Sequence, residues 1–138
     1  MALMVTSAAG ANGAGFGKLL AFTDDGKPIG VFGDDPRIVD PRGLGVDRVD
    51  RALFVNSGSN RILALGRNGQ VVRASKAIDG LNLGGGNFGP DGHYHVGLRN
   101  ERTIMAFARQ LNSACEYAPP PLLFWHSSPI AGCCRHGR

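Results

Sequence analysis

Two histidines separated by one residue, His93 and His95, have the side-chain types and spacing best suited to metal binding or proton transfer. On a strand, alternation would send both imidazoles to one face, with their Cβ atoms about 6–7 Å apart. Asp91 and Glu101 could add carboxylates. In the alternative, Tyr94 packs inward and both imidazoles lie on the opposite face of the sheet near solvent. The sequence favours this second arrangement, in which the histidines have no metal-binding role. A divalent metal site held by His93 and His95 remains the other interpretation.

Two glycine-rich motifs resemble nucleotide-binding loops but have the wrong context. Residues 84–89 read G-x-G-x-x-G, yet that fingerprint needs a helix directly after it, and Pro90-Asp91-Gly92 predicts a turn into another strand. Residues 13–18 hint at a phosphate loop, but Leu19 stands where a Ser or Thr must hold the metal. We therefore predict inter-strand loops and no nucleotide cofactor.

All three cysteines lie near the C-terminal end, with two of the four histidines: Cys115, His126, Cys133, Cys134 and His136. Adjacent cysteines cannot form the usual C-x-x-C knuckle, and the other spacings fit no common zinc site. We expect free thiols in an unstructured tail. An odd number of cysteines and no recognisable leader favour a reducing, cytoplasmic location.

Size and composition limit the chain to one domain. It has 138 residues, of which 43% are hydrophobic and 19% charged, within the range of globular proteins and without a run long enough to span a membrane. The net charge of +4 is spread singly along the chain, which argues against a nucleic-acid partner. Twenty-one glycines and eight prolines indicate many turns.

An apolar tetrad recurs three times at an almost constant interval, which indicates an internal repeat. The tetrads occupy residues 19–22, 62–65 and 104–107, so they are 43 and 42 residues apart. Glycine motifs around Gly43 and Gly86 repeat with an offset of 43. In the middle unit we predict four strands, at 43–46, 53–56, 61–65 and 70–75, and we predict no helix anywhere. Asn68-Gly69 indicates a type I′ hairpin turn.

The middle unit resembles an NHL repeat of the β-propeller class. The resemblance rests on the Pro41-to-Asp47 segment, an apolar strand, the Ser57-Gly58-Ser59-Asn60-Arg61-Ile62 turn and the Asn68-Gly69 hairpin. It implies an all-β fold, an incomplete propeller of four-stranded antiparallel blades, with units at about 3–40, 41–83 and 84–111. In the first unit, 3–7 reads as the second strand, so we expect the innermost strand to be missing or supplied from elsewhere. Residues 112–138 are predicted to be a disordered tail outside the repeat.

The resemblance also bears on binding and catalysis. Some NHL domains bind RNA on a basic face, which makes four arginines candidate anion contacts: Arg42, Arg61, Arg99 and Arg102. Arg61 follows the repeat pattern, however, and also suits a salt bridge between blades or a clamp on a carbonyl group. Enzymes resembling such propellers, including lyases, lactonases and related hydrolases, hold their metal on the central axis with ligands from several blades. No matching ligand set is identifiable in this chain.

Rings of this class need roughly 4–8 blades, because each blade covers its neighbour's apolar face. Three interpretations follow: a truncated or frameshifted relative, a short chain that closes a ring by oligomerisation, or a short stack of sheets. We expect a binding or scaffold module, or a non-functional remnant, with self-association through open blade edges. The alternative function is a lactonase-, hydrolase- or lyase-like enzyme that needs the missing blades.

Overall fold

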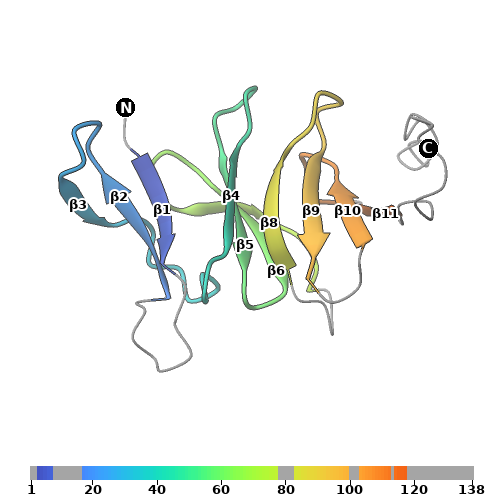
Figure 1. Ribbon diagram of the computed structural model, residues 1–138, viewed down its shortest axis with the longest axis horizontal. Coiled ribbons are helices and arrows are strands. Elements are labelled where there is room, and N and C mark those ends of the chain that lie inside the picture. The colour runs from blue at the N-terminus through green and yellow to red at the C-terminus, as the bar shows by residue number, and fades with distance from the viewer. Residues whose placement is uncertain (1–2, 8–16, 78–82, 100–102, 113, 118–138) are drawn as a thin grey trace.

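The computed structural model describes residues 3–7, 17–77, 83–99, 103–112 and 114–117, which form three antiparallel sheets (Figure 1). No helix occurs among these residues, as predicted, and so no described helix could cross a membrane. The strands are β1 (Leu3–Ser7), β2 (Lys18–Phe22), β3 (Pro28–Val31), β4 (Gly43–Val46), β5 (Leu53–Ser57), β6 (Arg61–Leu65), β7 (Val71–Ala74), β8 (Leu83–Phe88), β9 (Tyr94–Leu98), β10 (Thr103–Phe107) and β11 (Ala114–Tyr117).

The middle sheet, with strand order β4-β5-β6-β7, confirms the four strands predicted for the middle unit to within one residue at each end. Each strand is four or five residues long and each pairs antiparallel with the next. Both faces of β5 and β6 are buried, so these strands have continuous apolar runs rather than an alternating pattern.

The apolar tetrads form the third strand of each repeat unit. They lie in β2, β6 and β10, and each pairs with the strand that precedes it and the strand that follows it. By this correspondence β1 is the second strand of its unit, as predicted, and the described first sheet contains three strands where the other two sheets contain four. The fold is all-β and corresponds to part of a β-propeller.

The predicted offset between the glycine motifs is wrong by one residue. Gly45 pairs with Phe54 in the middle sheet, and Asn87 pairs with His95 in the third sheet. Phe54 and His95 each pair in turn with the third residue of their tetrad. Gly45 therefore corresponds to Asn87, 42 residues later. The offset of 43 residues predicted from Gly43 and Gly86 is one residue too long. The β8–β9 ladder contains an irregularity that the sequence pattern does not reveal.

The third sheet extends beyond the boundary predicted at residue 111. Its strand order is β11-β10-β9-β8, and β11 (Ala114–Tyr117) pairs with the whole of the tetrad strand. The segment predicted to lie outside the repeat thus begins with the fourth strand of the third blade. The predicted disorder from residue 118 onward falls outside the described residues.

The Asn68-Gly69 hairpin does not use the predicted type I′ turn. Gly69 has a φ of 79°, but Asn68 is not among the residues with positive φ. The Gly69 amide donates to the carbonyl of Gly66, and the Gly66 amide donates to the carbonyl of Gln70. The turn is therefore one residue longer than a two-residue loop. A register shift at Ala64/Leu65 accompanies it. Only the glycine carries the left-handed conformation, which fits a type I turn followed by a bulge.

The core consists of two apolar clusters, one on each face of the middle sheet. Toward the third sheet, the cluster contains Ala52, Phe54, Ile62, Ala64, Leu83, Tyr94, Val96, Leu98, Phe107 and Leu111. Toward the first sheet, it contains Leu19, Leu53, Val55, Leu63 and Leu65. Because the middle strands supply side chains to both clusters, the three sheets stack face to face as neighbouring blades do (Figure 1).

Glycines on the inner strands make room for the largest buried side chain, Tyr94. A Cβ added at Gly45 would lie 2.6 Å from Tyr94 Cε2, and one at Gly86 would lie 2.8 Å from Tyr94 Oη. The tyrosine ring is fully buried and contacts the rings of Phe54 and Phe88, with centroids 5.1 and 5.2 Å away. Burial raises the pKa of the Tyr94 phenol far above its ordinary value, so the group is neutral.

Candidate functional site

The turn between β4 and β5 is organised by the side chain of Asp47. Its Oδ1 accepts a hydrogen bond of 2.9 Å from the amide of Val49, and its carbonyl accepts one from Arg51, also 2.9 Å. Asp47 is only 2% exposed. An aspartate suits this position because its short side chain can bond to the backbone two residues later.

The second carboxylate oxygen of Asp47 joins the middle sheet to the third sheet. Arg109, which follows β10, donates to Asp47 Oδ2 through Nε and Nη2, both at 2.9 Å. Beside this pair, Arg73 Nη1 lies 2.8 Å from Asp50 Oδ2, and Arg109 Nη2 lies 3.6 Å from the same oxygen. We call these two aspartates and two arginines the inter-sheet network. Its formal charges cancel.

The network lowers the pKa of its more exposed carboxyl group, which belongs to Asp50. Burial alone raises the pKa of Asp50, but the amide of Ala52 and the guanidinium groups of Arg73 and Arg109 lower it by more. The net effect is a pKa below the ordinary value, so Asp50 stays ionised at neutral pH. Arg73 also lies over the Phe54 ring, 5.7 Å from its centroid, which ties the charged groups to the apolar core.

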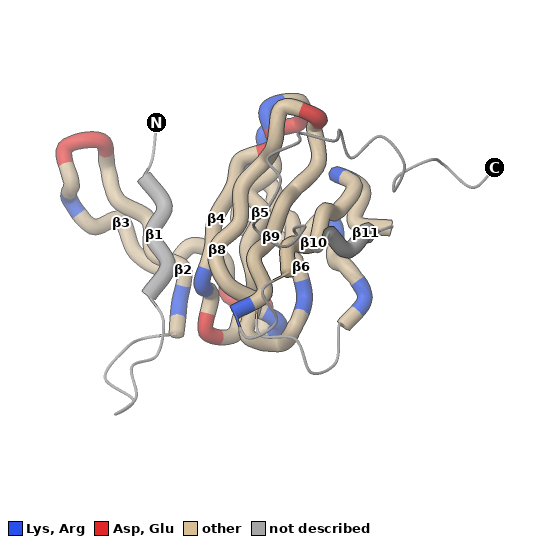
Figure 2. The backbone as a smooth tube through the Cα atoms, turned by 45° about the vertical axis from the view of Figure 1, so that its right-hand side comes forward, with Lys and Arg blue, Asp and Glu red and all other residues tan. Residues whose placement is uncertain are grey.

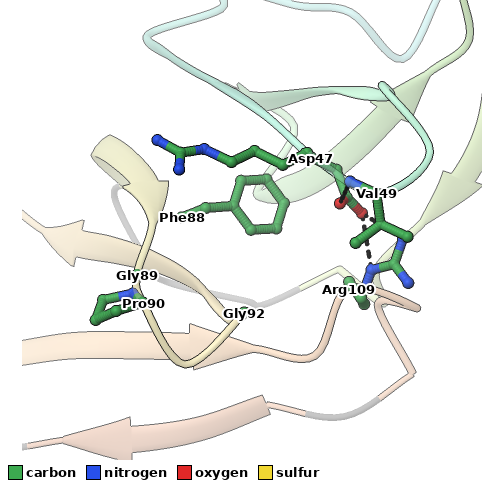
Figure 3. Close-up of a pocket in the computed structure, with 8 residues that line it drawn as sticks. Asp47, Val49, Phe88, Gly89, Pro90, Gly92 and Arg109 are labelled. Atoms are coloured by element: carbon green, nitrogen blue, oxygen red, sulfur yellow. Dashed lines mark hydrogen bonds and ion pairs between the residues drawn. The ribbon is translucent and has the colours of Figure 1, made fainter.

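A cavity of about 460 Å³ opens beside this network (Figure 3). The β4–β5 turn provides one wall and the β8–β9 turn provides the other, with the Asp47–Arg109 pair between them (Figure 3). The lining residues are Asp47, Arg48, Val49, Phe88, Gly89, Pro90, Gly92 and Arg109. The cavity therefore combines an aromatic ring, an aliphatic side chain and two arginines.

The two candidate metal ligands, His93 and His95, are brought together on one face, and a carboxylate lies between them. His93 Nδ1 is 3.2 Å from Asp91 Oδ2, and His95 Nε2 is 3.0 Å from Asp91 Oδ1. Burial raises the pKa of Asp91, but hydrogen bonds from His95 and the His93 amide, with both imidazole charges, lower it by more. Among the described residues, no group of three or more His, Cys, Asp or Glu side chains has an arrangement that could hold a metal ion.

The repeat correspondence identifies the face of the third sheet on which these histidines lie. His95 corresponds to Phe54 of the middle sheet, whose ring faces the neighbouring blade. Tyr94 lies on the opposite face, in the core. The histidines thus lie on the face of the third sheet that is turned away from the middle sheet, where a further blade would pack in a longer propeller.

The arginines predicted as anion contacts are not gathered into one site. Arg61 begins β6 and Arg99 follows β9, and neither has an ion pair with another described residue. Arg102 falls outside the described residues. Arg42, also considered in this role, pairs with Asp40 at 2.7 Å. Figure 2 shows basic residues distributed over both ends of the sheets, often beside acidic ones.

Within the part of the chain that the structure describes, the other sequence motifs form no site. Residues 84–88 of the G-x-G-x-x-G motif lie within β8, and a turn follows them rather than a helix, which confirms the reason for rejecting a nucleotide loop. Cys115 lies in β11. The remaining cysteines and histidines of the tail, Cys133, Cys134, His126 and His136, lie outside the described residues.

Sequence reasoning missed the inter-sheet network. Asp47 belongs to the repeat pattern, but its partner Arg109 is 62 residues away and follows no motif. The only local signal is the segment Asp47-Arg48-Val49-Asp50-Arg51, in which two aspartates three residues apart precede a strand.

No protein-family model and no curated protein sequence matches the chain. Solved structures do resemble it. Virginiamycin B lyase from Staphylococcus aureus, in selenomethionine form, matches with a TM-score of 0.62 and 18% identity over 77% of this chain and 36% of that one. A streptogramin B lyase structure matches with a TM-score of 0.60 and 17% identity, over 85% and 40% of the respective chains.

A catalytically inactive variant of the Staphylococcus aureus virginiamycin B lyase, with quinupristin, gives a TM-score of 0.61 and 17% identity over the same shares of the two chains. At these identities the likeness shows the β-propeller fold alone. The chain spans about two fifths or less of the length of the structures it matches.

Proposed function

We propose that this chain is a segment of an NHL-like propeller that acts as a binding or scaffold module. The support comes from the middle unit, whose sequence resembles an NHL repeat and whose four strands form one sheet packed on both faces. No catalytic set converges within the described residues. The described part of the fold instead offers surfaces on which other sheets or partners can pack.

One observation carries this proposal, the exposed apolar edge of the first sheet. All four residues of β3 are exposed, and Ile29 and Val31 retain 60% and 53% of their surface. An edge strand of this kind has unpaired backbone groups and exposed apolar side chains, which favours pairing with a strand of another chain. We propose a second copy of this chain as the partner, with blades from several copies completing one ring.

Native mass tests the proposal. Light scattering on a size-exclusion column should give a discrete dimer or trimer, and Val31→Lys should shift the protein to monomer because a buried charge in the contact is costly. Val72→Lys is the matched control, since Val72 is 55% exposed on the outer strand of the middle sheet. A monomer or a polydisperse aggregate in the unmodified protein would contradict ring completion by self-association and would favour a non-functional remnant.

The second candidate function is a lyase-like propeller enzyme that needs further blades. Two observations favour it: the structural likeness to the virginiamycin B and streptogramin B lyases named above, and the Asp91 carboxylate held between two imidazoles. The described residues do not form a three-ligand metal group, and we assign no chemical step to a metal. Metal content of the purified protein tests this candidate. A stoichiometric divalent ion lost in the His93→Ala/His95→Ala variant would support it, whereas a metal-free protein would count against it.

A further inference from the structure

We propose that the cavity between the β4–β5 and β8–β9 turns binds a small organic anion, a carboxylate attached to a planar apolar group. This inference does not depend on ring closure, because every residue that lines the cavity lies in the middle or third sheet of one chain or in a segment that directly follows one of their strands. It also goes beyond the proposed scaffold role, since it assigns a small-molecule ligand to this end of the sheets.

The size and walls of the cavity define the apolar part of the ligand. Its volume of about 460 Å³ falls in the range of small-molecule pockets, roughly 300–1,000 Å³. Phe88 is held from behind by Phe54 and Tyr94, with ring centroids 4.8 and 5.2 Å away, and the uncovered part of its ring lines the cavity. Val49 and Pro90 complete the apolar lining (Figure 3). A planar group can pack against a ring that is fixed in this way.

The charges define the polar part of the ligand. Asp47 and Asp50 are already neutralised by Arg109 and Arg73 in the inter-sheet network. Arg48 lines the same cavity, and no described residue forms an ion pair with it. The lining therefore has one uncompensated positive charge, and it belongs to a guanidinium group, whose planar donors match a carboxylate. A cationic ligand would be repelled here.

The neighbouring Arg51 provides a matched comparison. Arg51 lies on the same turn, is exposed and forms no ion pair with a described residue, but it does not line the cavity. A non-specific attraction between an anion and this basic turn would depend equally on both arginines. Of these two arginines, only Arg48 would contribute to a ligand bound in the cavity.

The test is a titration of the full chain with 2-naphthoate, followed by amide chemical shifts. The neutral analogue 2-naphthylmethanol is titrated in parallel. We expect saturable shifts at Val49, Gly89 and Gly92, weakened about tenfold by Arg48→Gln and unchanged by Arg51→Gln. The alcohol should bind about tenfold more weakly than the carboxylate. Phe88→Leu should weaken both ligands, because it removes the ring but not the charge.

Each contrary result overturns the inference. These results are shifts that do not saturate, equal effects of Arg48→Gln and Arg51→Gln, and equal binding of acid and alcohol. Since Arg48 is exposed on a turn, Arg48→Gln should leave the fold intact, and the amide spectrum without ligand verifies this. Oligomeric state is measured on the same samples, so failure of the ring-closure proposal and failure of the cavity proposal are separate outcomes.

Discussion

Replacing Gly45 by alanine should destabilise the packing between the middle and third sheets. The new Cβ would lie 2.6 Å from Tyr94 Cε2, whereas carbon atoms in contact are about 3.5–4.0 Å apart. About 1 Å of overlap must therefore be relieved. Tyr94 cannot move away easily, because it is fully buried and lies against two aromatic rings.

The expected cost is about 1–3 kcal/mol, the usual range for one extra methyl in a packed core, partly offset by the reduced entropy of the unfolded chain. Gly85→Ala is the matched control, since a Cβ there would have no atom within 4 Å and Gly85 does not have positive φ. Its stability should stay the same or rise by up to about 1 kcal/mol. The two alanine variants should thus differ by about 2 kcal/mol.

Urea unfolding followed by far-UV circular dichroism measures both variants under the same conditions. The double variant Gly45→Ala/Tyr94→Leu completes a cycle, in which the smaller side chain should remove most of the cost of the added methyl. If Gly45→Ala were as stable as the unmodified protein, or if Gly85→Ala lost as much, the close approach of the sheets around Tyr94 would be refuted.

Three further predictions address the charges and turns. Asp47→Asn should lower the unfolding free energy by about 1–3 kcal/mol, because it leaves a half-buried guanidinium without its carboxylate, while Asp35→Asn, which alters an exposed local pair, should change the urea midpoint little. Asp50 and Asp91 have folded-state pKa values below the ordinary 3.8. Their contribution to stability is therefore full above about pH 4 and is lost as the pH falls through the lower folded-state pKa values. Thermal unfolding measured from pH 7 to pH 3 should show this loss. Gly69→Ala should cost about 1–2 kcal/mol in the urea assay, because its φ of 79° disfavours a side chain and the new Cβ would lie 2.9 Å from the Gly33 amide nitrogen.

The strands of the middle unit were predictable because their determinants are local. Residues 62–65 form an uninterrupted apolar run between turn-forming segments, and the repeat interval assigned the same role to 19–22 and 104–107. The details of the turns were less predictable. Asn68-Gly69 allows both a two-residue turn and a longer one with a bulge, and the pairing of Ala64 and Leu65 with β7 decides between them.

The candidate site was not predictable, because it depends on how the sheets are placed against each other. Asp47 is a turn residue by local criteria, and nothing near Arg109 distinguishes it from the other arginines. Only the packing of two sheets brings them to 2.9 Å. The histidines were the opposite case: alternation on a strand correctly placed His93 and His95 on one face, but whether they bind a metal stays a prediction.

Alternation along β4 explains how one short segment creates both the core contact and the cavity. Gly43, Gly45 and Asp47 are buried and alternate with more exposed residues, so all three face the third sheet. The two glycines let the inner strands approach closely and leave space for Tyr94. The aspartate, two positions further on, meets Arg109 where the strands end. The apolar contact between the two sheets ends at Asp47, and the cavity begins there. Replacing either glycine should therefore disturb the cavity as well as the core.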